Sequence, residues 1–209
     1  FFESNKGSIL GKFIIPNWAK CILFFTRVKY KVEGLENLES NSNYIFAGNH
    51  ASSFDIPLAF AGLPYWLVPI AKIELKSIFI LGWVMDSAGH IWVDRRKTST
   101  ALDTLKKTKD SLYKKPRSIL LFPEGTRTLD GSLGSFKKGG LSLSLYTSLP
   151  IVPIAFNGTF NLLPKGSNKM ISSEVIKLKI GKPFSPDDYY KDNQVELAEY
   201  IRGKVQKLL

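Results

Sequence analysis

The sequence predicts an α/β fold: a single layered domain in which helices flank a mostly parallel or mixed central sheet. Short runs of β-branched and aromatic residues alternate with helical patterns along the chain, and this alternation is typical of a layered sheet-and-helix domain. The length of 209 residues and the hydrophobic share of 44% suit one such domain with a sizeable core. We expect an N-terminal amphipathic two-helix segment in addition.

The expected strands are short runs rich in residues that favour extended backbone. They are residues 28–32, 44–48, 67–71, 91–93, 119–122, 151–156 and 175–180. The expected helices are residues 56–61, 75–85, 98–114, 139–147 and 194–208. Because functional residues of such sheets gather on loops at strand ends, each polar motif can be judged by whether it follows a strand.

The N-terminal residues 1–27 combine large apolar side chains with Lys6, Lys12, Lys20 and Arg27. No uncharged run approaches the ~18–20 residues that a membrane span requires. We expect two short helices, broken near Pro16, that lie in a membrane interface with their cations at the headgroups. The alternative is a helical hairpin packed on its own domain.

The composition narrows the possible functions. Lys and Arg total 29 against 18 Asp and Glu, a net charge of +11, which calls for nucleic acid, anionic lipid or a phosphorylated substrate. The single cysteine, Cys21, excludes an intrachain disulfide framework and a multi-cysteine metal site. Two histidines, His50 and His90, are too few for a three-histidine zinc site.

The loop at residues 49–55, NHASSFD, directly follows an expected strand. Histidine is the side chain best suited to general-base work near neutral pH, and a carboxylate on one ring nitrogen leaves the other free to accept a proton. On a regular helix, His50 and Asp55 would point ~140° apart, so they meet only if the chain turns between them. The alternative is that Asp55 or Ser53 caps the following helix.

Residues 89–95, GHIWVDR, contain a short expected strand that delivers Asp94 and Arg95 at its end. Arginine suits phosphate because its planar fork makes paired, charge-assisted hydrogen bonds. The alternative is a solvated basic turn.

Residues 122–127, FPEGTR, follow the strongest expected strand. Gly125 allows close backbone approach and Arg127 offers a second anion clamp. A plain turn with an internal Glu124–Arg127 pair is the alternative. Residues 149–154, LPIVPI, carry two prolines in an apolar strand, which suggests an edge strand or a pocket wall.

These four blocks, in this order, resemble those of the 1-acylglycerol-3-phosphate acyltransferase family of the glycerolipid acyltransferases. The resemblance implies transfer of a fatty acyl group from an acyl thioester to the sn-2 hydroxyl of lysophosphatidic acid, giving phosphatidic acid. By position, His50 would be the general base and Asp55 its orienting partner. The remaining positions would bind or shape the substrate phosphate site: Arg127, Arg95, Glu124, Gly125 and, outside the blocks, Lys72.

The resemblance also implies partners and a location. Residues 28–209 would form the acyltransferase catalytic domain, with lysophosphatidic acid, an acyl-ACP or acyl-CoA donor and an anionic membrane surface as partners. The enzyme would lie on the cytoplasmic face of the membrane, peripheral or monotopic through the N-terminal helices. No metal or other cofactor is expected, since a thiolate is a good leaving group.

Other functions remain as alternatives. One is an acyltransferase for another lysolipid, and a second is an acyl ester or thioester hydrolase that uses His50 with water. Nucleic acid binding is disfavoured, because the aromatic residues cluster in the N-terminal segment and do not interleave with a basic stripe.

Overall fold

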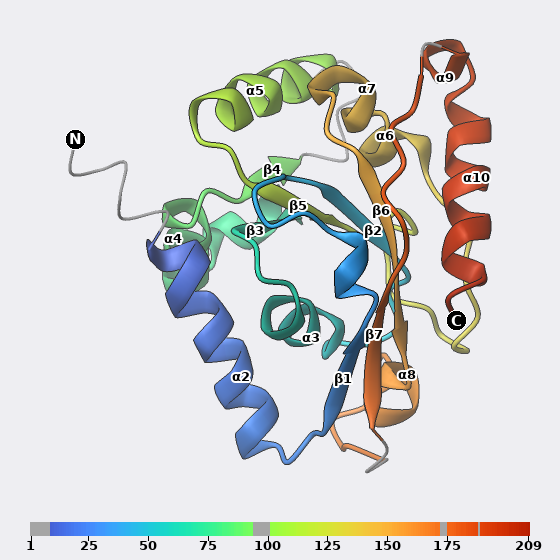
Figure 1. Ribbon diagram of the computed structural model, residues 1–209. Helices are drawn as coiled ribbons and strands as arrows, with labels where there is room; N and C mark the ends of the chain where they lie inside the picture. The colour runs from blue at the N-terminus through green and yellow to red at the C-terminus, as the bar shows by residue number, and fades with distance from the viewer. Residues whose placement is uncertain (1–8, 94–100, 172–174, 188) are drawn as a thin grey trace.

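The structure, a computed structural model, describes residues 9–93, 101–171, 175–187 and 189–209. Within these ranges, seven strands form one sheet in the order β1-β7-β6-β2-β5-β3-β4 (Figure 1). The strands are β1 Tyr30–Glu33, β2 Ile45–Gly48, β3 Leu67–Lys72, β4 Ile91–Val93, β5 Ser118–Leu121, β6 Ile151–Asn157 and β7 Ile176–Ile180. The expected α/β fold is confirmed, and every expected strand is present with ends shifted by at most two residues.

The sheet is parallel except for one strand pair. Strand β2 lies between β5 and β6 and is parallel to both, while β6 and β7 are antiparallel. All residues of β2 and β5 are buried, as expected for parallel strands that are covered on both faces. Strand β1, which lies at an edge, alternates between half-buried and exposed residues.

Helices cover both faces of the sheet. Phe46 in β2 packs in one core with α2 and α3, whereas its neighbours Ile45 and Ala47 pack in a second core with α10, because successive strand residues point to opposite faces. Figure 1 shows the sheet running between α2 and α3 on one side and α10 on the other. The longer helices are α2 Ile15–Phe25, α3 Asp55–Gly62, α4 Phe79–Ser87, α5 Ala101–Lys114 and α10 Gln194–Gln206. The shorter ones are η1 Leu10–Ile14, η2 Leu35–Asn37, η3 Ile73–Ser77, α6 Lys138–Leu141, α7 Leu143–Thr147, α8 Thr159–Leu162 and α9 Tyr189–Asp192.

Two expected helices are each divided in the structure. The expected helix at 75–85 is a 3₁₀ turn, η3, followed by α4, because Ile78 between them is extended with φ −77° and ψ 107°. The expected helix at 139–147 is two short helices, α6 and α7, that meet at Ser142.

The expected break near Pro16 is wrong for the described residues. The backbone is helical from η1 through α2, and the N–H of Ile15 donates to the carbonyl of Leu10 with the five-residue spacing of a π-turn. Pro16 stands in the first turn of α2, where a missing N–H leaves no α-helical bond unmade. Ile15, Ala19 and Leu23 on α2 are buried in the core with α3, so this helix packs on the domain along one face.

The close approach of Gly11 to Trp66 gives a stability test. A Cβ at Gly11 would overlap the indole ring of Trp66, which is 8% exposed and donates from Nε1 to the carbonyl of Ala88 over 3.1 Å. We expect Gly11→Ala to lower the free energy of unfolding by about 1–3 kcal/mol through overpacking. Thermal unfolding followed by circular dichroism measures it.

Gly203→Ala in α10 is the matched control, because no heavy atom lies within 4 Å of a Cβ there. That substitution should stabilise the protein by roughly 0.4–1 kcal/mol, as replacing a helical glycine with alanine does. A Gly11→Ala protein as stable as the parent would contradict the described packing.

Candidate active site

The candidate site lies where three loops meet at one edge of the sheet. His50 follows β2, residues 122–127 follow β5, and the loop that contains Lys165 comes after β6 and α8. Because β2, β5 and β6 are parallel neighbours, their carboxyl ends point to the same edge, which is where ligands of α/β sheets bind. The topology therefore brings together motifs that are far apart in the sequence.

The side chains of His50 and Asp55 meet as expected. Nδ1 of His50 lies 2.8 Å from Oδ2 of Asp55. The same carboxylate oxygen accepts from the backbone N–H groups of Ala51 and Ser52, at 2.7 and 2.8 Å. The Asp55 side chain is fully buried and begins α3, yet it faces back to the loop that precedes it. These hydrogen bonds fold the chain between the two residues.

The capping alternative for this loop is wrong. Phe54 occupies the capping position of α3, and no side chain makes a capping hydrogen bond there. The Ser53 hydroxyl instead accepts a 2.6 Å hydrogen bond from Nη1 of Arg127. The two candidate capping side chains, Asp55 and Ser53, thus contact His50 and Arg127 and do not cap the helix.

The His50 imidazole is held on both sides. Its ring stacks on Phe122 with 4.0 Å between ring centroids and 19° between ring planes. A carboxylate only accepts hydrogen bonds, so Nδ1 is the protonated nitrogen of the neutral ring and Nε2 carries the lone pair. The side chain remains 18% exposed and lines the main cavity. This is the arrangement of a general base whose tautomer is fixed by a carboxylate.

Glu124 braces the histidine loop. Its Oε1 accepts from the backbone N–H of His50 at 2.7 Å, and its Oε2 accepts from the N–H of Gly134 at 2.9 Å. The N–H of Thr128 donates to the His50 carbonyl over 2.9 Å. Both Glu124 oxygens are engaged by backbone amides, so the alternative of an internal Glu124–Arg127 pair is wrong. Glu124 is buried and does not line the cavity, so it shapes the site by holding the backbone of His50 and Gly134.

Two further predicted residues, Gly125 and Arg127, line the cavity. Gly125 has φ 76°, a left-handed conformation that favours glycine, and its N–H donates to the Phe122 carbonyl at 3.0 Å. Arg127 reaches Ser53 across the site. The FPEGTR turn thus places a guanidinium beside the loop of His50.

For Arg95 and Lys72 the placement is incomplete. Arg95 lies outside the described residues, so its phosphate role stays a prediction. Lys72 is the last residue of β3, at the same edge of the sheet as the ends of β5 and β2. Its side chain is outside the described part, and its role also stays a prediction.

Lys165 is a site residue that the sequence reasoning missed. Its Nζ lies 3.0 Å from Oγ1 of Thr126 and 3.4 Å from the carbonyl of Arg127, and the residue lines the cavity. The available signal was the Pro-Lys-Gly turn that follows the last parallel strand. The sequence around Lys165, however, gives no sign that this turn contacts the FPEGTR turn.

The three loops open onto a cavity of about 1030 Å³, at the upper end of the range for small-molecule sites. Its polar lining comes from His50, Ser53, Thr126, Arg127 and Lys165. The apolar walls come from η1 and α2, the start of α3, β3 and the α4 region, and they include Leu10, Ile14, Trp18, Ile22, Pro57, Phe60, Ile70, Leu75, Val84 and Met85. The cavity therefore joins a cationic, base-bearing region to a long apolar surface.

His90 also lines this cavity, but it differs from His50. Burial lowers the pKa of His90 to about 4, and the nearby Arg117 cation acts in the same direction. Among the described residues, its Nδ1 is buried without a hydrogen-bond partner. His90 is therefore neutral at pH 7 and adds no positive charge, and in the described part of the chain no carboxylate orients it as Asp55 orients His50.

Two features concern the described ranges as a whole. No helix there combines the length and the apolar character needed to cross a bilayer. No group of three or more His, Cys, Asp or Glu side chains in those ranges is placed to hold a metal ion.

The site's motifs fall inside a recognised family region. Residues 29–157 match the family model described as "Acyltransferase". The 1-acyl-sn-glycerol-3-phosphate acyltransferase BAT2 (chloroplastic) of Brassica napus is 36% identical over 92% of this chain and 54% of its own length. A 1-acyl-sn-glycerol-3-phosphate acyltransferase of Saccharomyces cerevisiae is 33% identical over 95% of this chain and 67% of its own length.

A solved structure agrees with these sequence matches. The crystal structure of the 1-acyl-sn-glycerophosphate (LPA) acyltransferase PlsC from Thermotoga maritima superposes with a TM-score of 0.75 at 28% identity, over 92% of this chain and 76% of that one. The chain spans about half the length of the Brassica napus relative. The matched region contains the His50–Asp55 pair and the FPEGTR turn, and the chain belongs to the 1-acyl-sn-glycerol-3-phosphate acyltransferase family.

Proposed function

We propose that the protein transfers a fatty acyl group from an acyl thioester, acyl-ACP or acyl-CoA, to the sn-2 hydroxyl of 1-acyl-sn-glycerol 3-phosphate, giving phosphatidic acid. One observation carries the proposal: a carboxylate-oriented histidine and an arginine line the same large apolar cavity. The names of the relatives support the acceptor. They leave the choice of donor open.

The proposed reaction needs one proton carrier. Nε2 of His50 accepts the proton of the sn-2 hydroxyl as its oxygen attacks the thioester carbonyl, and Asp55 stabilises the imidazolium that forms. The tetrahedral intermediate collapses, its carbon–sulfur bond breaks, and the thiolate takes the proton from His50. A positioned base of this kind contributes on the order of 10²–10⁴-fold in rate.

Substrate binding would use the two regions of the cavity differently. Arg127 makes charge-assisted hydrogen bonds to the acceptor phosphate, while the apolar walls take up acyl chain. Holding the hydroxyl against Nε2 converts an encounter between two substrates into a reaction within one complex, which accounts for much of the remaining acceleration.

The two alternatives are separated by their products. An acyltransferase for another lysolipid would use the same base with a different acceptor. A hydrolase would use His50 to activate water and would release fatty acid from the thioester without any acceptor. The cation beside His50 favours transfer to a phosphate-bearing acceptor, because water, the acceptor in hydrolysis, carries no charge that would need Arg127.

His50→Ala tests the base. We expect formation of phosphatidic acid to fall by at least about 100-fold because the proton acceptor is lost, with little change in thermal unfolding. The measurement is product analysis with labelled acyl thioester, with and without lysophosphatidic acid. Asp55 is less suitable for this test, because its carboxylate also holds two backbone amides.

Near-normal turnover by a folded His50→Ala protein would rule out the proposed base. If the parent protein released free fatty acid at the same rate with and without acceptor, the hydrolase alternative would replace transfer.

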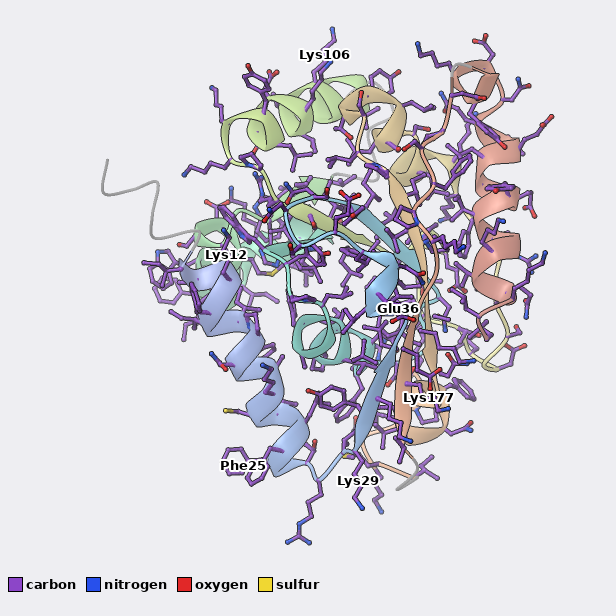
Figure 2. All side chains as sticks on the ribbon, viewed as in Figure 1. Lys12, Phe25, Lys29, Glu36, Lys106 and Lys177 are labelled. Atoms are coloured by element: carbon purple, nitrogen blue, oxygen red, sulfur yellow. The ribbon has the colours of Figure 1, made fainter. Side chains whose placement is uncertain are left out.

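We also propose that the protein works on the cytoplasmic face of a membrane, peripheral or monotopic, through its N-terminal helix. Large apolar side chains on this segment are exposed, among them Phe24 at 76% and Phe25 at 79%. Figure 2 labels Lys12 and Phe25 near the two ends of the helical segment. Apolar side chains with interspersed lysines suit a helix that lies in the headgroup region.

Helix α4 adds a second exposed apolar surface near the same cavity. Phe79, Ile80 and Trp83 are 91%, 71% and 70% exposed. Both α4 and α2 contribute walls to the cavity, for example Met85 and Trp18. A bilayer that contacts both helices would meet the cavity between them, so acyl chains need not pass through water.

A double substitution, Phe24→Gln with Phe25→Gln, tests the membrane proposal. The two rings pack on each other and do not line the cavity, so the fold and the site should persist. We expect binding to vesicles that contain anionic phosphatidylglycerol to weaken roughly tenfold or more, given the apolar area that two phenylalanines bury. Vesicle sedimentation measures it.

Tyr113→Gln on α5 is the matched control, because Tyr113 is 89% exposed and α5 packs on the other face of the sheet. Equal loss of vesicle binding in the control, or none in the double variant, would contradict the proposal. Deleting the helix is a poorer test, since Ile15, Ala19 and Leu23 belong to the core.

A further inference from the structure

Lys165 sits at the corner of a tight turn that is tied to the histidine loop. The N–H of Ser167 donates to the carbonyl of Pro164 over 3.2 Å, and Gly166 takes the φ of +88° that this turn requires. The hydroxyl of Ser52 donates to the carbonyl of Leu163, at 2.8 Å. The position of Lys165 is therefore set by the same loop that carries His50.

The charge of Lys165 has no anionic partner in the described part of the chain. Among the residues that the structure describes, its Nζ donates to the Thr126 hydroxyl and the Arg127 carbonyl, while an ammonium has three hydrogens to donate. Among the described residues, no carboxylate oxygen lies within 4.0 Å of Lys165 or Arg127. The nearby carboxylate of Glu124 is engaged by two backbone amides. Within the described ranges, Lys165 and Arg127 therefore face one cavity without a carboxylate partner.

We propose that Lys165 is a further cation of the acceptor phosphate site, and that with Arg127 it makes the protein select phosphomonoester acceptors over phosphodiester ones. The inference rests on the proposed function. A phosphomonoester carries a charge of about −1.5 to −2 at neutral pH, whereas a phosphodiester carries a single negative charge. A pair of cations matches the monoester, and a single arginine would suffice for the diester.

Arg127 and Lys165 would bind the phosphate in different ways, because a guanidinium and an ammonium differ in shape and flexibility. The Arg127 guanidinium is a planar fork that already donates to Ser53, so its orientation is fixed. The Lys165 ammonium is a compact point charge on a flexible stem, and it needs only a side-chain rotation to exchange the Thr126 hydroxyl for a phosphate oxygen. Hydrogen bonds in which the donor or the acceptor is ionised are about twice as strong as those between neutral groups.

Acceptor kinetics of Lys165→Met test the inference. With lysophosphatidic acid we expect KM to rise about tenfold or more, as loss of a hydrogen bond to a charged group predicts. With lysophosphatidylglycerol, a phosphodiester, KM should rise much less, so the preference for the monoester shrinks. Lys165→Arg should retain most of that preference because the charge remains.

Lys169→Met is the matched control: Lys169 is exposed on the same segment but does not line the cavity. An equal rise in KM for both acceptors in Lys165→Met, or the same change in Lys169→Met, would overturn the inference. A purely structural role for Lys165 would affect both acceptors alike.

Titration calorimetry with sn-glycerol 3-phosphate separates this inference from the proposed function. If the parent protein makes no phosphatidic acid yet binds glycerol phosphate and loses that binding in Lys165→Met, the phosphate site stands and the proposed reaction falls. If the parent protein makes phosphatidic acid and Lys165→Met leaves both acceptor preference and glycerol phosphate binding intact, the inference about Lys165 falls alone.

Discussion

The buried carboxylate of Asp55 is the constraint on which the site depends. A carboxylate without water needs donors around it, because an unpaired buried charge is costly. Asp55 finds three on one oxygen: the imidazole of His50 and two backbone amides. These bonds fold a five-residue loop back on itself and aim the histidine at the cavity. They also fix the first residue of α3, the helix against which α2 packs.

Outward from Asp55, the site is held mainly by bonds between side chains and backbone across loops. Glu124 ties the FPEGTR turn to the backbone of His50, and Ser52 ties the His50 loop to the carbonyl of Leu163. Each bond joins loops that follow different strands of the parallel sheet. The geometry of the His50 side chain thus depends on the order of β2, β5 and β6, and a site of this kind is precise because rigid strands carry its loops.

Much of this could be predicted from the sequence, for physical reasons that vary by element. The strands are runs of β-branched and aromatic residues with clear ends, and all were expected. The His50–Asp55 contact could be stated only as a condition, since spacing does not reveal a turn. The division between η3 and α4 depends on the extended backbone of one residue, Ile78, which helical periodicity does not register.

Lys165 shows where local reasoning stops. Its neighbours in sequence look like an ordinary turn, and its significance comes from contacts with Thr126 and Arg127, 39 and 38 residues away. The continuity of the helix through Pro16 is a similar case. Proline disfavours a helix interior, but here a π-turn precedes it and the residue falls in the first turn of α2.

Side chains of helix α2 lie in three different environments. Leu23 is in the core, Trp18 lines the cavity while 52% exposed, and Phe25 points to solvent. These three residues lie within about two turns of one another. Under the proposed function, a substitution at Trp18 that lengthens or shortens the acyl-binding part of the cavity would also change the exposed apolar surface of this helix. Acyl-chain preference and membrane affinity would therefore, under the same proposal, both depend on this one helix and would tend to change together.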